Sequence, residues 1–359
     1  MVDFRKNTLK AVCFDRPDFI PVNFYVNESC YHLYDQNWLF DQMESHPLLF
    51  PGFVRPGQPY KPVYSNVAQA GRPYKDDFGC VWKTEEDGIT GTVVEHPLYD
   101  LSRAKNYPWP NPEKCMGIGE LDWGAEEERI LQEKAAGSLT VRGLRHGHTF
   151  LQLCDLCGYE NLIYAMMDES EDLGIIIEAI EKFNSFIVKK YNRMGVDIIT
   201  FAEDLGMQRG PMISPDLFRR YILPVYKRMM QLVDPDRIIH MHSDGDIRLL
   251  MDDLLISGVK ILNLQDNVNG ISFIHDHLKG KCCIELDIDR QFITKRGSPQ
   301  EIDDYIKFVV DTLGDRSGGA YVNLWVVWRN TNGKCTGADG CIRKVHVLLN
   351  KRTVKKESY

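Results

Sequence analysis

The chain has 359 residues and a mass of 41.4 kDa, enough for one large or two ordinary domains with full hydrophobic cores. Its hydrophobic content of 43% and charged content of 26% are those of a soluble globular protein. The formal net charge of −8 argues against nucleic acid or an anionic membrane surface as a partner. No apolar run approaches about 18 residues, and the segment MVDFRKNTLK has no apolar stretch, so we expect neither a membrane span nor a secretion signal.

The ten cysteines are scattered along the chain. In the absence of an export signal, we expect them to be reduced thiols in the cytoplasm. Cys154 and Cys157 form a C-x-x-C pair, a spacing found in redox and zinc sites, but no second pair accompanies them. We therefore interpret these two cysteines as part of the core packing.

The N-terminal half contains two predicted strands, PVNFYV at 21–26 and SLTVRGLRHG at 138–147, and a predicted helix across 159–192. Region 50–135 differs, because it is rich in Pro, Gly and Trp. Within it, DDFGCVWKTEEDGITGTVVEHPL predicts a β-hairpin that turns at EEDG. We interpret this region as an insertion over one end of the fold.

From residue 196 onward, apolar strands alternate with helices. The predicted strands are 196–205, RIIHMHSD at 237–244, KILNLQD at 260–266 and CCIELDID at 282–289. The predicted helices are SPDLFRRYILPVYKRMMQLV at 214–233, IRLLMDDLLIS at 247–257, ISFIHDHL at 271–278 and SPQEIDDYIKFVVDTL at 298–313. Ser214 and Ser298 are N-cap candidates, each followed by proline, and Gly258 closes the second helix.

Strands that are apolar throughout and alternate with helices predict a parallel sheet covered on both faces. We therefore assign the chain to the α/β class and expect a (β/α)8 TIM barrel, in which chemistry lies at the carboxyl ends of the strands. Polar residues fall at these strand ends in several places: Arg145, His146, His148, Glu203, Asp204, His242, Asp244, Gln265, Asp266, Glu285, Asp287 and Asp289.

The segment 320–359 differs from the preceding residues 1–319 in its composition and in its sequence pattern. It contains eight basic and two acidic residues, and no cap or turn chemistry continues the fold after YVNLWVVW. A basic interaction arm is one interpretation. Reading the codons one nucleotide later permits LMLIYGLYGETPMENVQAL, which contains the strand, glycine turn and helix start that a last β/α unit needs. We therefore predict a barrel domain over 1–319 and a frameshifted replacement of its last β/α unit over 320–359.

Five motifs carry a resemblance to a known superfamily: DDFGCVWKTEEDGITGTVVEHPL, FAEDLGMQRGPMISPDLFRRYILP, HSDGDI, SGVKILNLQD and ELDIDRQ. Over roughly residues 1–319 the chain resembles uroporphyrinogen decarboxylase and the methylcobamide:coenzyme M methyltransferases. The shifted reading of the tail adds GLYGETPMEN, which is similar to the usual ending of that family. The resemblance implies a TIM barrel.

The decarboxylase branch has an N-terminal arginine motif of the type MRQAGR, which binds the carboxylates of a porphyrin. The matching region here, PVNFYVNESCYHLYD, contains no arginine. A highly anionic substrate would then lack compensation for its desolvation. The methyltransferase branch holds zinc with a His-x-Cys pair and a later cysteine. HSDG aligns with that pattern, so that His242 matches the histidine and Asp244 replaces the cysteine.

The resemblance and the strand-end rule together make Glu203, His242 and Asp244 the candidate catalytic residues and also the candidate ligands of a zinc ion. Substrate contacts are expected from the remaining strand-end positions Arg145, His146, His148, Gln265 and Asp287. The alternative at each position is a structural role, as a loop cap, a solvated charge or a histidine bonded to a carboxylate. His240 lies deeper in its strand, and we expect it to be a core histidine.

The implied function is methyl transfer between a small O- or N-methylated substrate and a corrinoid carried by a separate protein. HDHLKG does not match a cobalamin-binding motif, so no corrinoid is expected in this chain. Two alternatives stay open. One is a uroporphyrinogen decarboxylase-type decarboxylase, which needs no cofactor, and the other is an inactive degenerate barrel or a binding protein.

Overall fold

The computed structural model describes residues 3–47, 49–50, 52–57, 59–289 and 292–326. The chain divides into two compact units. The first comprises residues 1–65, 86–89 and 264–359, and the second comprises residues 66–85 and 90–263. Strand β8 (Ile261–Gln265) contains the boundary between them.

The second unit is built on three neighbouring parallel strands, β5 (Val141–Gly143), β6 (Ile198–Ala202) and β7 (Ile238–Ser243). Their side chains are largely buried in β6 and β7, which is why the sequence shows continuous apolar runs there. In the register of this sheet, Ala202 lies opposite His242. The parallel α/β class predicted from the sequence is therefore confirmed in this unit.

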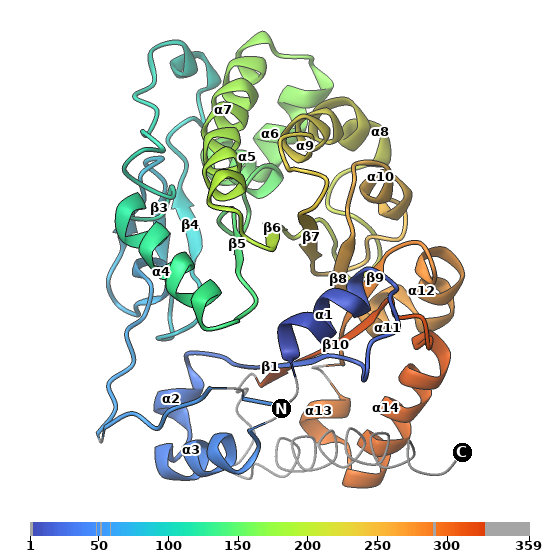
Figure 1. Cartoon of the computed structure of the whole chain (residues 1–359). Coiled ribbons are helices and arrows are strands. Elements are labelled where there is room, and N and C mark those ends of the chain that lie inside the picture. The colour runs from blue at the N-terminus through green and yellow to red at the C-terminus, as the bar shows by residue number, and fades with distance from the viewer. Residues whose placement is uncertain (1–2, 48, 51, 58, 290–291, 327–359) are drawn as a thin grey trace, which may run out of the picture. The chain divides into compact units, whose positions relative to one another are not determined.

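Helices follow these strands in the order α5 (Phe150–Cys157), α6 (Tyr159–Met167), α7 (Glu171–Met194) and, after β6, α8 (Pro215–Leu217) and α9 (Leu223–Met230). Helix α7 packs against β5 and β6 (Figure 1). The single helix predicted across 159–192 is wrong, because the chain turns between α6 and α7, where Glu169 has a φ of 55°. Helix α5 was not predicted. It buries Cys154 and Cys157, which confirms their interpretation as core residues.

The predicted helix 214–233 is interrupted by one π-helical turn, η3 (Phe218–Ile222), between α8 and α9. Pro224 explains the interruption, because proline has no N–H to donate and its ring clashes with the carbonyl four residues earlier. The predicted N-cap is confirmed, since the Ser214 hydroxyl accepts from the Leu217 N–H at 3.3 Å. Helix α10 (Met251–Ile256) follows β7 and begins later than the predicted position 247.

The predicted hairpin in the 50–135 region is confirmed. Strands β3 (Val81–Lys83) and β4 (Thr92–Glu95) pair antiparallel, and the short strand β2 (Tyr74–Lys75) extends this sheet by one further strand. The region also contains two 3₁₀ helices, η1 (Asn66–Ala68) and η2 (Leu101–Asn106), and the helix α4 (Trp123–Ala135). The Asp122 side chain caps α4.

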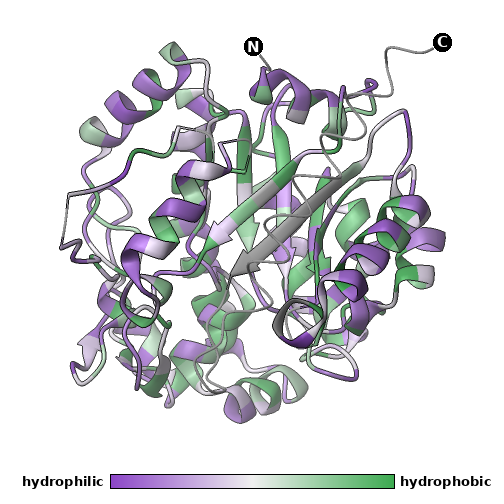
Figure 2. Cartoon of the chain, turned by 90° about the horizontal axis from the view of Figure 1, so that it is seen from below, coloured by the Kyte–Doolittle hydropathy of each residue, from purple (hydrophilic) through white to green (hydrophobic). Residues whose placement is uncertain are grey.

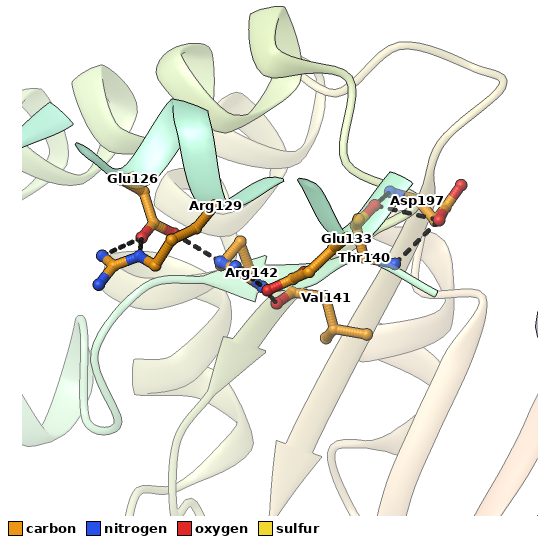
Figure 3. Close-up of polar contacts among 7 residues, drawn as sticks. All are labelled: Glu126, Arg129, Glu133, Thr140, Val141, Arg142 and Asp197. Carbon is orange, nitrogen blue, oxygen red and sulfur yellow. Dashed lines mark hydrogen bonds and ion pairs between the residues drawn. The ribbon is translucent and has the colours of Figure 1, made fainter. Parts of the chain in front are cut away.

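Polar contacts fasten the amino ends of β5 and β6 (Figure 3). The Asp197 carboxylate accepts from the Thr140 N–H at 2.9 Å and from its hydroxyl at 3.0 Å. Arg142 of β5 pairs with Glu126 and Glu133 of α4. These groups lie at the opposite end of the strands from the polar residues expected to carry function, so they serve stability.

The first unit is likewise built on parallel strands. Strands β9 (Cys283–Asp287) and β1 (Val22–Val26) each pair parallel with β10 (Ala320–Val326). Its helices are α1 (Phe4–Val12), α2 (Cys30–Leu33), α3 (Gln36–Ser45), α11 (Asp266–Asn269), α12 (Ile271–Leu278), α13 (Ile293–Arg296) and α14 (Pro299–Leu313). The predicted N-cap Ser298 is confirmed at the start of α14, where it forms a capping box with Glu301. In Figure 2 the helices carry both hydrophobic and hydrophilic stretches, as expected when one face is buried.

The first seven residues of the atypical tail form strand β10. The remainder, 327–359, which includes Cys335 and Cys341, lies outside the described residues. The eight cysteines in the described ranges are free thiols. Among the described helices, none has both the length and the hydropathy needed to cross a membrane.

Candidate metal centre

Three side chains converge at the carboxyl ends of β5, β6 and β7 in the second unit. They are His146, Asp204 and His242, called here the His–Asp–His cluster. Their potential ligand atoms all lie within 4.8 Å of one another. The arrangement follows from the parallel sheet, because neighbouring parallel strands end at the same edge and deliver their following residues to one place.

Asp204 lies at the centre of the cluster. Its Oδ1 atom is 3.4 Å from Nε2 of His146 and 3.5 Å from Nε2 of His242. Burial acts to raise the pKa of Asp204, but the hydrogen bonds and positive charge offered by the two histidines outweigh it and hold the pKa well below its usual range. Asp204 is therefore a carboxylate at any physiological pH.

His242 is oriented by a residue on the next strand. Its Nδ1 atom is hydrogen-bonded to the amide oxygen of Asn263, which lies on β8 and is buried. An amide oxygen only accepts, so Nδ1 carries the proton. Nε2 is then the nitrogen on the side of Asp204: it donates to the carboxylate when the ring is charged, and it is free to bind a metal ion once that proton has left. This is the arrangement by which proteins fix a metal-binding histidine.

The donor atoms fit a zinc ion. Two imidazole nitrogens and one carboxylate oxygen are a typical catalytic zinc set, which leaves a fourth position for substrate. Ligand atoms about 2.0–2.2 Å from a tetrahedral zinc are about 3.3–3.6 Å apart. The distances of 3.4 and 3.5 Å from Asp204 to the two histidines fall in this range.

Asp244, one of the predicted ligands, lies at the edge of the cluster. Its Oδ1 atom is 4.0 Å from Nε2 of His242. Its backbone N–H donates to Oδ1 of Asp204 at 3.1 Å, which positions that carboxylate. The group of potential ligands within 4.8 Å of one another does not include Asp244.

Glu203, the third predicted ligand, points to the other face of the sheet. Side chains alternate along a strand, so Asp204 shares a face with Thr200 and Ala202, whereas Glu203 shares one with Phe201. The Glu203 side chain is fully buried and accepts from the backbone N–H groups of Thr149 and Leu151. The structure therefore groups Asp204, and not Glu203, with His242.

The two predicted substrate-binding histidines after β5 have different surroundings. His146 belongs to the cluster, and its side chain is half exposed. His148 is fully buried, and its ring packs against Phe201 and Tyr226. Burial lowers the pKa of His148 to about 3, so this ring is neutral. The structure places this side chain in the interior of the second unit, and its role as a substrate contact stays a prediction.

Arg145, also predicted to bind substrate, is engaged in a buried ion-pair network. Its guanidinium lies 2.8 Å from Asp155 of α5 and 3.5 Å from Asp76 beside the hairpin. It also lies over the Trp82 ring of β3, 5.6 Å from the centroid. Asp76 in turn accepts from the Trp82 indole N–H at 2.8 Å. Arg145 therefore joins the hairpin to α5.

Gln265 and Asp287 end strands β8 and β9 and belong to the first unit. Their roles as substrate contacts stay predictions. His240, expected to be a core histidine, lies in β7 and is partly buried.

Three members of the site were not predicted in their observed roles, and one of them is His146, which was expected as a substrate contact rather than as a metal ligand. Asp204 was expected among the polar strand-end residues but not as a ligand, and its place beside His242 follows only once the register of β6 and β7 is known. Asn263 was missed altogether. The available signal was an isolated amide in the apolar run KILNLQD, which is unusual because a buried polar group requires a partner.

Comparison with known proteins agrees with this fold. A family model described as uroporphyrinogen decarboxylase (URO-D) matches residues 75–323. A methyltransferase from Methanosarcina mazei is structurally similar, with a TM-score of 0.63, 13% sequence identity and coverage of 99% of each chain. At this identity the likeness shows a shared fold.

A B12-independent methionine synthase from Shewanella sp. W3-18-1 is similar with a TM-score of 0.41 and 11% identity, over 66% of this chain and 70% of that chain. This similarity is too weak to support an argument. A search of curated protein sequences found no match.

Proposed function

We propose that this chain, which belongs to the uroporphyrinogen decarboxylase (URO-D) family, is a zinc-dependent methyltransferase. It would move a methyl group between a small O- or N-methylated substrate and a corrinoid bound to a separate protein. The observation that carries the proposal is the His–Asp–His cluster, whose donor atoms have the chemistry and spacing of a catalytic zinc site.

Three residues would hold the zinc ion: His146, Asp204 and His242. Asp204 supplies a charged oxygen without releasing a proton, and His242 supplies Nε2 because Asn263 occupies its other nitrogen. His146 is half exposed and forms the solvent side of the cluster. A bound zinc ion supplies a Lewis acid, which polarises a methyl-bearing heteroatom or favours the thiolate form of an acceptor.

The proposal includes a closed architecture. In the URO-D fold the strands form a TIM barrel, and we infer an eight-stranded barrel for this chain as well. The support is the parallel pairing of β5, β6 and β7 in one unit and of β9, β10 and β1 in the other. The barrel would orient the substrate, while the corrinoid on its partner would carry the cobalt chemistry.

Decarboxylation of a porphyrin-type substrate is the second candidate, and the family match favours it. Such a reaction requires cationic groups that bind several carboxylates. Arg145, an arginine at the strand ends of the second unit, is buried and paired with two carboxylates. This pairing supports the methyltransferase over the decarboxylase. An inactive barrel is the third candidate.

Zinc content and methyl transfer test the proposal together. The purified chain should contain one equivalent of zinc, and H242A should lack it. With methylcobalamin and a small thiol, the wild-type chain should consume the methyl–cobalt absorbance faster than H242A does. A chain without zinc that releases carbon dioxide from a uroporphyrinogen would establish the decarboxylase instead. A folded chain with neither property would be an inactive barrel.

A further inference from the structure

The Glu203 carboxylate lies at the junction of three segments in the interior of the second unit. One of its oxygens accepts from the Thr149 N–H at 2.8 Å and from the Leu151 N–H at 2.9 Å, at the start of α5. The other accepts from the Tyr226 hydroxyl of α9. The side chains of Glu203 and Tyr226 are fully buried, so water does not compete for these hydrogen bonds.

We propose that Glu203 is a positioning residue that holds His146 opposite Asp204. Glu203 precedes Asp204 in the chain, and Thr149 follows His146 by three residues. The carboxylate therefore joins the two segments that carry these members of the His–Asp–His cluster. What the positioned histidine does for the reaction rests on the proposed function, but the positioning itself does not.

Neighbouring contacts support this role. The Gly147 N–H donates to the Ala202 carbonyl at 2.8 Å, so the same two segments are also joined by the backbone. The His148 ring packs on Tyr226, and its carbonyl accepts from the Asn184 amide of α7 at 2.7 Å. Within this set, Glu203 is the side chain that binds the start of α5 from the strand that carries Asp204.

The side chain must accept two hydrogen bonds with one oxygen and a third with the other. Glutamine keeps an oxygen for both backbone N–H groups, and the Tyr226 hydroxyl can rotate to accept from its amide nitrogen. Alanine leaves two N–H groups and one hydroxyl buried without their partner, which is costly for a dry interior. We therefore expect E203Q to preserve the position of His146 and E203A to lose it.

The experiment compares E203A and E203Q with D197N, a matched control. Asp197 is a buried carboxylate of the same segment that accepts from Thr140 at the amino end of β6, away from the cluster. Zinc affinity is measured by competition with a chromophoric chelator. E203A should bind zinc about 10- to 100-fold more weakly than wild type, the usual effect of losing a group that orients a ligand. E203Q should remain close to wild type, and D197N should match wild type at equal folded fraction.

A second measurement separates this inference from the proposed function. The NMR signals of the His146 imidazole are recorded for the metal-free protein, where they report its contact with Asp204. They should move in E203A and stay in place in D197N, whether or not the wild type binds zinc. If wild type binds no zinc, the proposed function fails while this readout still decides the inference.

Unchanged His146 signals and unchanged zinc affinity in a folded E203A would overturn the inference, and so would an equal loss in D197N. Should E203A not fold, Y226F replaces it, because this change removes one donor to Glu203. Y226F should shift the His146 signals by less than the complete loss of the contact between His146 and Asp204 would. No shift at all would count against the role of Glu203.

Discussion

His242 and Asn263 are hydrogen-bonded across neighbouring strands, with the ring nitrogen Nδ1 donating to the amide oxygen. This bond fixes the tautomer and the rotation of the ring, and it directs Nε2 toward Asp204, 3.5 Å away. In the largely apolar strand β8, the Asn263 side chain therefore orients His242, a candidate ligand on β7.

Removing this orienting amide should weaken metal binding without removing a ligand. For N263A we expect about a 10- to 100-fold loss of zinc affinity, because His242 would no longer be held in one tautomer and rotamer. Chelator competition at neutral pH measures the loss. N161A is a suitable control, because Asn161 bonds to backbone carbonyls of Tyr99 and Cys157. Equal affinities of N263A and wild type would contradict the assignment of Asn263.

Asp204 and Asp244 can be separated by a pair of equivalent substitutions. D204N should lose zinc by more than about 100-fold, since an amide oxygen replaces a charged ligand at the centre of the cluster. D244N should lose much less, because its side chain lies outside the group of close ligand atoms. Metal analysis after dialysis against a weak chelator compares the two variants. A larger loss in D244N would restore the ligand set that the HSDG motif suggested.

The loops after β6 and β7 approach so closely that only glycine fits where they meet. Gly245 has a φ of +79°, and a Cβ atom there would lie 2.2 Å from the Gly206 carbonyl carbon. G245A should therefore destabilise the fold beyond the roughly 1–2 kcal/mol of left-handed backbone strain. Gly137 is a matched control, with a φ of +75° and open space around it. Thermal unfolding should show a greater loss for G245A than for G137A, and equal losses would exclude the clash.

Two carboxylates share the buried guanidinium of Arg145, and this gives the fold a specific pH dependence. Burial raises the pKa of Asp155 to about 6, although Arg145 acts to lower it. The unfolded value is about 3.9, so the folded chain holds this proton more tightly. The protonated Asp155 carboxyl therefore contributes to the free energy of unfolding. This contribution is fully present below about pH 3.9 and is lost as the pH rises through about 6.

The comparison with D155N isolates this effect. Between about pH 4.5 and 7.5, the unfolding free energy of wild type should fall by about 2 kcal/mol relative to that of D155N. Urea unfolding at the two pH values, followed by tryptophan fluorescence, measures this difference. A difference that grew in favour of wild type with rising pH would show that ionised Asp155 stabilises the fold.

The frameshift prediction for 320–359 is tested on the nucleic acid. Sequencing the gene region should reveal codons that, read one nucleotide later, encode GLYGETPMEN. The described residues show that Ala320–Val326 already pairs with β9 and β1. A frame-corrected chain should unfold at a higher temperature, because a complete last β/α unit covers more apolar surface. Codons that forbid this reading would end the idea.

The class of fold and its repeating order could be predicted from local patterns. Apolar strands alternating with capped helices indicated a parallel sheet, and the turn chemistry at EEDG indicated the hairpin, because both depend on residues close together in the chain. The helix break at Pro224 and the separate helix α5 were missed. Pro224 was itself a local signal for the break, and α5 lies between the predicted strand 138–147 and the predicted helix 159–192, where no element was expected.

The sequence by itself placed a histidine and neighbouring carboxylates at the ends of β6 and β7, since that follows from strand periodicity. Only the tertiary structure decided which carboxylate faces His242, because the choice between Glu203 and Asp204 depends on which face of the sheet is enclosed by helices. It likewise separated His146, which joins the cluster, from Arg145, which is held by Asp76 and Asp155. The nearest partners in space determine whether a charged side chain is available to the site, and those partners lie far away in the sequence.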